Sequence, residues 1–137
     1  MPIRVVRLGT PRAKGEGVRL GTVRRPPRGV PKSEFARRDY YDTWLPALAA
    51  SGPLVSWALA EPWTDARWRR YERRYRAEMK APAARHLIET LAALSRTADF
   101  SIGCYCENPA RCHRSILAEL LENAGAEMAT DALVGPK

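Results

Sequence analysis

The sequence predicts an α/β fold: a single layered domain whose small sheet is at least partly parallel and flanked by helices. Two β-branched segments, residues 3–6 and 18–23, precede a run of helical patterns, and an apolar strand-like segment at residues 100–105 follows it. Helices placed between non-adjacent strands are typical of parallel pairing. The length of 137 residues suits one domain, which we expect to span residues 1–137.

The N-terminal third contains two predicted strands and two predicted loops. Residues 3–6 form the first strand, and residues 18–23 alternate apolar with small or polar side chains, as a second strand does. Between them, residues 11–17 are rich in turn formers. Residues 24–32 contain three prolines, which lack a backbone donor and exclude a central strand or helix. We therefore expect residues 11–17 and 24–32 to be exposed basic loops.

Helical patterns dominate the middle of the chain. Residues 40–49 and 53–60 are short apolar-rich segments that predict two helices separated by Ser51 and Gly52. Thr64 is a suitable N-cap for the next helix. One face of that helix carries a large apolar stripe, which we interpret as core: Trp68, Tyr71, Tyr75 and Met79.

Another helix is predicted from Pro82, because proline is favoured in the first helical turn. Leu87, Ile88, Leu91 and Leu94 form its apolar stripe. A buried strand at residues 100–105, a turn, and a helix reaching Leu121 follow. Residues 126–134 are compatible with an edge strand.

Charge is concentrated near the N-terminus. The chain has a net charge of +8, and residues 1–38 hold 11 Lys and Arg against 2 acidic residues. Such a surface attracts anions through its electrostatic field. The predicted partner is an anionic small molecule, with nucleic acid as the alternative.

No apolar run approaches the roughly 20 residues that span a bilayer, so no membrane partner is expected. The N-terminus also lacks the apolar stretch and cleavage site of a signal peptide. The three cysteines lie within nine residues, unlike the spread cysteines of a secreted disulfide framework. These features together predict a cytoplasmic protein.

The segment most capable of chemistry is the strand–turn–helix at residues 102–115. Asn108 suits an N-cap and Pro109 the first helical position, although a start nearer Cys112 would aim free amides at a bound anion. The helix dipole and neighbouring arginine favour a thiolate there. Cys112 and His113 are the candidate catalytic residues, and Arg114 and Ser115 the candidate anion-binding residues.

A metal site is an alternative interpretation of the same residues. The ligand types suit a zinc centre, although the C-x-C-x₅-C-H spacing differs from paired C-x₂₋₄-C knuckles. Adjacent helical residues also diverge by about 100°. Metal binding is therefore not the favoured prediction; its ligands would be Cys104, Cys106, Cys112 and His113.

Two further interpretations stay open: a redox thiol pair, in which Cys104 or Cys106 resolves Cys112, and buried structural cysteines without reactivity. A phosphatase loop is excluded, because the sixth residue after Cys106 is Cys112 and not the arginine of C-x₅-R.

Several motifs together resemble the domain-of-unknown-function 488 family, including its YeaO-like branch. They lie in the loop around residues 24–32, the segment 44–51, the aromatic segment 68–79 and residues 106–115. Val23 and Pro26 depart from the acidic residue and tryptophan of the YeaO-like pattern. The resemblance implies an α/β domain in which Arg24 and Arg28 share a cleft with the Cys-His-Arg segment, and it leaves the reaction and cofactor open.

The leading functional hypothesis is binding of, or action on, a phosphorylated or otherwise anionic, nucleotide-like small molecule at the Cys-His-Arg-Ser helix start. A nucleic-acid-binding module using the arginine-rich N-terminal third is the rival, although no helix-turn-helix, RNP or zinc-finger signature is present. A non-catalytic accessory protein with structural cysteines is the third hypothesis.

Overall fold

The computed structural model describes residues 2–129, and its centre is a four-stranded sheet. The strands run in the order β1-β4-β2-β3 and all pair in parallel, which confirms the predicted α/β class. The central strand, β4, pairs with β1 and β2 on its two sides. The strand bounds are β1 Ile3–Arg7, β2 Val18–Gly21, β3 Thr43–Trp44 and β4 Phe100–Cys104.

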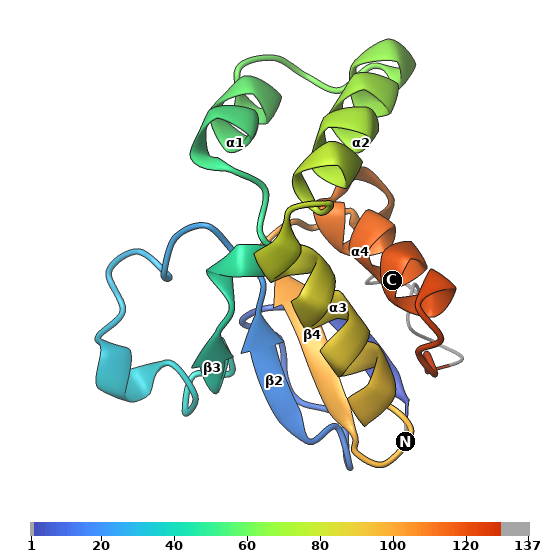
Figure 1. The fold of residues 1–137 in the computed structure, drawn as a ribbon. Helices are drawn as coiled ribbons and strands as arrows, with labels where there is room; N and C mark the ends of the chain where they lie inside the picture. Colours follow the sequence, from blue (N-terminus) through green and yellow to red (C-terminus); the bar gives the residue numbers. More distant parts are fainter. Residues whose placement is uncertain (1, 130–137) are drawn as a thin grey trace.

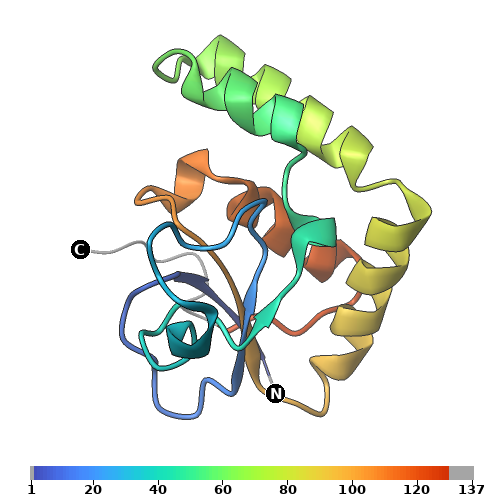
Figure 2. The ribbon, with the colours of Figure 1, turned by 90° about the vertical axis from the view of Figure 1, so that its left-hand side faces the viewer.

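Four α-helices accompany the sheet, and Figures 1 and 2 show where they lie. Two of them, α3 and α4, lie on one face of the sheet, whereas α1 and α2 lie side by side beyond the carboxyl ends of β2 and β4 (Figure 1). Their bounds are α1 Gly52–Leu59, α2 Asp65–Glu78, α3 Pro82–Leu94 and α4 His113–Asn123, and short 3-10 helices span Lys32–Glu34, Pro46–Leu48 and Pro109–Arg111.

Local capping determines where α1 and α2 begin. Thr64 accepts a hydrogen bond from the amide of Arg67 at the start of α2, which confirms the predicted N-cap. Ser51, which was not predicted as a cap, accepts one from the amide of Leu54 at the start of α1. Ser51 also donates its hydroxyl and amide to the carboxylate of Glu78 at the end of α2. These bonds connect the beginning of α1 to the end of α2.

The main core lies between the sheet and the helices. Ile3, Phe100 and Ile102 contribute the inward side chains of alternate strand positions. The predicted aromatic stripe of α2 is confirmed as core, since Tyr71, Tyr75 and Met79 are buried and Trp68 packs against them. The Tyr75 hydroxyl donates to the carbonyl of Leu48 at 2.7 Å, which satisfies its polar atom inside the core.

The other face of the sheet buries a charged group. Arg19 of β2 is fully buried, with Nε 2.8 Å and Nη2 3.0 Å from the two oxygens of Glu16. Ser101 of β4 donates to the same carboxylate at 2.7 Å. The two carbonyls of Thr10 and Asp39 accept from the Nη1 atom of Arg19. Both members of the buried Arg19–Glu16 ion pair thus have further hydrogen-bond partners, as the burial of an ion pair requires.

The predicted helix at residues 40–49 is wrong. This segment forms β3 at the sheet edge, followed by the 3-10 helix Pro46–Leu48. Proline disfavours α conformation in the residue before it, and Leu45 adopts φ −128° and ψ 64° accordingly. The free edge of β2 then pairs with Thr43 and Trp44, a contact that local pattern does not encode.

The two predicted basic loops are loops, with one buried residue in each: Glu16 in residues 11–17 and Pro27 in residues 24–32. Of the predicted edge strand at residues 126–134, Met128 forms a single parallel bridge with Ile3, and residues 130–134 lie outside the described part. Within residues 2–129, no helix combines the length and apolar character needed to cross a membrane.

Candidate functional site

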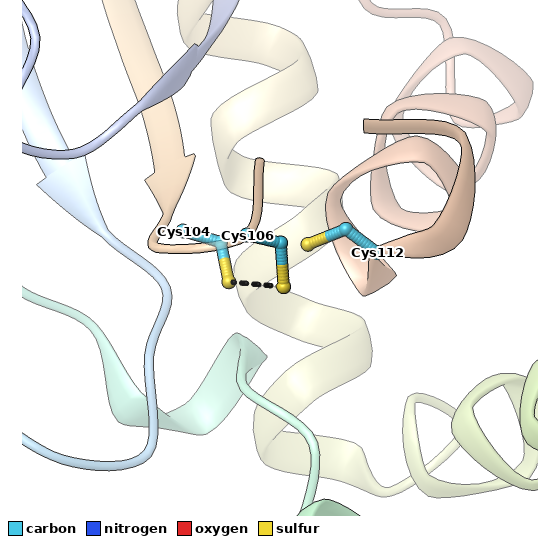
Figure 3. Close-up of side chains that lie close together, drawn as sticks. All are labelled: Cys104, Cys106 and Cys112. Atoms are coloured by element: carbon cyan, nitrogen blue, oxygen red, sulfur yellow. Dashed lines mark hydrogen bonds between the residues drawn. The ribbon is translucent and has the colours of Figure 1, made fainter. Parts of the chain in front are cut away.

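Three thiols converge where β4 ends and α4 begins (Figure 3). Cys104 is the last residue of β4, Cys106 lies in the following loop, and Cys112 is the N-cap of α4. The sulfur atoms of Cys104 and Cys106 are 3.7 Å apart, and all three sulfur atoms lie within 4.8 Å of one another. All three cysteines are free. The sequence cluster is therefore also a spatial cluster.

The turn between Cys106 and Cys112 explains this convergence. Asn108 accepts the amide of Ala110 at 3.0 Å and caps a single 3-10 turn, Pro109–Arg111. Cys112 is then extended, with φ −141° and ψ 148°, and α4 starts at His113. Of the two helix starts considered from sequence, the later one is observed. The 100° divergence between adjacent helical residues does not apply to Cys112, since it precedes the helix.

The three thiols hold their protons unequally. Hydrogen bonds from the thiols of Cys106 and Cys112, together with the charge of Arg114, hold the pKa of Cys104 well below its usual range. The pKa of Cys106 is raised, chiefly because its thiol is hydrogen-bonded to Cys104. Burial, together with the hydrogen bonds of Cys112 to Cys104 and Cys106, raises the pKa of Cys112 well above its usual range. Cys104 is therefore the most acidic of the three thiols.

His113 has a defined tautomer. Its Nε2 lies 2.6 Å from the carbonyl oxygen of Thr22, which can only accept, so Nε2 carries the proton. Its Nδ1 lies 3.8 Å from the sulfur of Cys112 and presents a lone pair. Burial lowers the pKa of His113, which favours the neutral ring. The imidazole therefore acts as an acceptor toward the thiol side of the site.

Arg114 and Ser115 both face the backbone of the cysteine loop. Arg114 is buried and donates to the carbonyl of Cys106 through Nη2; its Nε is buried without a hydrogen-bond partner in the described part of the chain. The hydroxyl of Ser115 donates to the carbonyl of Cys112 at 2.9 Å. The two residues predicted to bind an anion are therefore engaged in holding the thiol loop.

A cavity of about 350 Å³ opens beside the cluster. The three cysteines and His113 line one part of it, and apolar side chains of α1 and α2 line another. Arginine residues contribute to the same lining: Arg24, Arg25 and Arg111. The apolar and aromatic part of the lining includes Val55, Leu59, Trp63 and Tyr71. The thiols thus meet a largely apolar cavity whose lining includes three arginine residues.

The three arginines that line the cavity differ in the partners that their side chains already have. Arg24 donates to the carbonyls of Ala50 and Pro46 at 3.0 Å each, which holds its guanidinium near the cavity. Arg111 pairs with the exposed Asp65 at 2.8 Å. Arg25 is exposed and has no hydrogen bond from its side chain to another described residue. Arg25 is therefore the cation most available to a ligand.

The structure brings together some of the predicted site residues and separates others. Cys112, His113 and Arg24 line the cavity together, as do Cys104 and Cys106 of the alternative metal set. Arg28 is exposed and does not contribute to the lining. Arg114 and Ser115 are also absent from the lining and donate instead to the carbonyls of Cys106 and Cys112.

The sequence did not predict that two arginines and two aromatic residues line the cavity. Arg25 and Arg111 are each adjacent in sequence to a predicted site residue, Arg24 and Cys112. Trp63 and Tyr71 come from the α1–α2 region, and no local pattern indicates that this region approaches the cysteines.

Comparisons with known proteins give one informative result. A search of curated proteins and a search of solved structures returned no match. One family model, described as the active DUF488-N3 subclade, matches residues 3–125 and so covers the strands, the helices and the thiol cluster. The chain belongs to the DUF488 family, through its subclade DUF488-N3a.

Proposed function

We propose that this protein binds a small anionic molecule in the cavity and presents it to the thiol cluster. One observation carries the proposal: Arg24, Arg25 and Arg111 line the same cavity as the three thiols and His113. Guanidinium groups bind carboxylate and phosphate through paired hydrogen bonds. The cavity volume of about 350 Å³ lies within the usual size of small-molecule sites.

The walls favour a ligand with a flat or apolar body. Trp63 and Tyr71 supply aromatic surface, and Leu59 and Val55 of α1 supply aliphatic surface. Such surfaces bind rings, whereas the arginines bind a charged group. A nucleotide-like molecule with one charged end combines both features.

The reactive end of the site is its thiol cluster. Cys106 is the exposed member, so a bound molecule reaches its sulfur most easily. Cys112 and His113 stay the predicted reactive pair, with Nδ1 of His113 as the acceptor 3.8 Å from the Cys112 sulfur. A reducing compartment such as the cytoplasm suits these free thiols.

Thermal stability tests the binding. We expect the metal-free protein to melt at a higher temperature with phosphate, or with a mono- or dinucleotide, and Arg25→Ala to lose that shift. At 100 times the dissociation constant, a ligand stabilises by about 2.7 kcal/mol. Arg28→Ala is the matched control, because Arg28 is exposed in the same loop but does not line the cavity. An equal shift in wild type and Arg25→Ala would contradict the proposal.

Nucleic acid is the second candidate, favoured by exposed arginines on α2 and in the loop 24–32. Arg69, Arg70, Arg73 and Arg74 are exposed, and the guanidinium groups of Arg70 and Arg74 lie over the ring of Trp57. Binding through many phosphates weakens steeply with salt, whereas binding of one small anion weakens less. A steep salt dependence that survives Arg25→Ala would favour this candidate.

A further inference from the structure

The thiol cluster also has the features of a metal site. Among the described residues, it is one group of three potential ligands whose donor atoms converge: the sulfur atoms of Cys104, Cys106 and Cys112. The chain contains three cysteines in total, and the fold brings every one of them to this point. Thiolates are soft ligands that prefer zinc to magnesium or calcium.

The sulfur positions fit a tetrahedral ion. With zinc–sulfur bonds of about 2.3 Å, tetrahedral geometry places two ligand sulfurs about 3.8 Å apart. The observed separation between Cys104 and Cys106 is 3.7 Å, and no pair in the cluster exceeds 4.8 Å. A sulfur movement of about 1 Å, within reach of a side-chain rotation, closes the remaining difference.

The surroundings balance the charge of such a site. Three thiolates around a divalent cation carry a net charge of −1, which must be compensated when it is buried. The buried guanidinium of Arg114 is bonded to the carbonyl of Cys106 and supplies one positive charge beside the cluster. The N-terminus of α4, where Cys112 occupies the N-cap position, adds a favourable dipole.

The fourth coordination position has an open side. All three cysteines line the cavity of about 350 Å³, so an ion among their sulfurs would face that space. Structural zinc sites are closed by four protein ligands, whereas catalytic sites keep one position for water or substrate. Nδ1 of His113 lies near the sulfur of Cys112 but outside the converging group, so His113 is a neighbour of the ion in this arrangement.

We propose that Cys104, Cys106 and Cys112 bind one zinc ion whose fourth coordination position opens into the cavity. The proposal goes beyond anion binding and does not depend on it, because the three sulfur positions alone define the site.

Cobalt substitution tests the site directly in the full chain. After chelator treatment under reducing conditions, we expect the protein to bind one Co²⁺ per chain and to show thiolate-to-cobalt charge transfer and the intense visible bands of tetrahedral cobalt. One equivalent of Zn²⁺ should abolish these bands. Cys106→Ser should lose the charge-transfer intensity of one thiolate and bind less tightly, whereas His86→Ala, which changes an exposed histidine outside the cluster, should match wild type.

A second measurement needs no variant. In wild-type protein, zinc should protect the native thiols from a thiol-reactive dye, and a chelator should restore their reactivity. Absence of the cobalt bands, identical bands in folded Cys106→Ser, or thiols unprotected by zinc would overturn the proposal. The anion-binding test uses metal-free protein and Arg25→Ala, so either proposal can fail without the other.

Discussion

His113 at the start of α4 donates a hydrogen bond to the backbone of Thr22, directly after β2: Nε2 lies 2.6 Å from the carbonyl oxygen. The two residues are 91 positions apart in sequence. Because Thr22 itself donates its hydroxyl to the carbonyl of Gly103, this contact joins α4, β2 and β4 at one point. The imidazole is held with Nδ1 toward Cys112.

The first prediction concerns the proton on this ring. We expect metal-free protein at neutral pH to carry it on Nε2 and to leave Nδ1 unprotonated, because the Thr22 carbonyl can only accept. Nitrogen-15 NMR of the imidazole distinguishes the tautomers. Thr22→Val keeps the accepting carbonyl and should leave the tautomer unchanged, whereas a proton on Nδ1 in wild type would contradict the structure.

Thiol labelling is the second prediction. Cys106 is exposed, while Cys104 and Cys112 are buried, so iodoacetamide should label Cys106 first in the native metal-free protein. The rate should rise with pH into the alkaline range, because the pKa of Cys106 is raised and the thiolate is the reactive form. Peptide mass spectrometry identifies the site. Faster labelling of Cys112 than of Cys106 would show that exposure does not control access.

The third prediction concerns the buried pair of Glu16 and Arg19. Glu16→Gln should destabilise the fold at neutral pH by about 3–5 kcal/mol, because it leaves the buried guanidinium without its counter-charge. Urea unfolding measures this loss. Glu34→Gln is the control: its partner Arg37 is largely exposed, so the effect should be small.

The pH dependence of that loss has a defined sign. Burial raises the pKa of Glu16, but hydrogen bonds from Arg19, Ser101 and the amide of Ala13 outweigh it, so the folded pKa lies below the unfolded value. The stabilisation is therefore complete above the unfolded pKa, about 4.3, and is lost as the pH falls through the folded value. The difference in stability between wild type and Glu16→Gln should shrink on acidification; a difference that grows would refute this linkage.

The fourth prediction concerns the stability contributed by the hydroxyl groups of two buried tyrosines, Tyr75 and Tyr41. Tyr75→Phe should cost about 1–2 kcal/mol, because it removes the 2.7 Å hydrogen bond to the carbonyl of Leu48 and leaves that buried acceptor without its donor. Tyr41→Phe should be neutral or slightly stabilising, since the Tyr41 hydroxyl is buried without a partner in the described residues. Thermal unfolding compares them. Equal losses would show that ring packing, and not the hydroxyl, sets the cost.

Local chemistry in the sequence was sufficient to predict much of the fold. Apolar periodicity placed α2 and α3, Thr64 and Asn108 occupy predicted N-cap positions, and proline marked the start of α3. These features depend on neighbours within about four positions, which a sequence shows directly. The family resemblance was likewise carried by short motifs, and the match over residues 3–125 confirms it.

The sequence by itself determined that the three cysteines are close, because nine residues contain them all, and that they lie at a strand–turn–helix junction. Only the tertiary structure decided that Cys112 precedes the helix and turns its sulfur toward Cys104 and Cys106, that residues 43–44 pair with β2, and that Arg19 is buried beside Glu16. It also placed Arg25, Trp63 and Cys106 around one cavity. These outcomes depend on contacts between distant segments, which pack only when the sheet and its helices come together, and no local periodicity encodes such contacts.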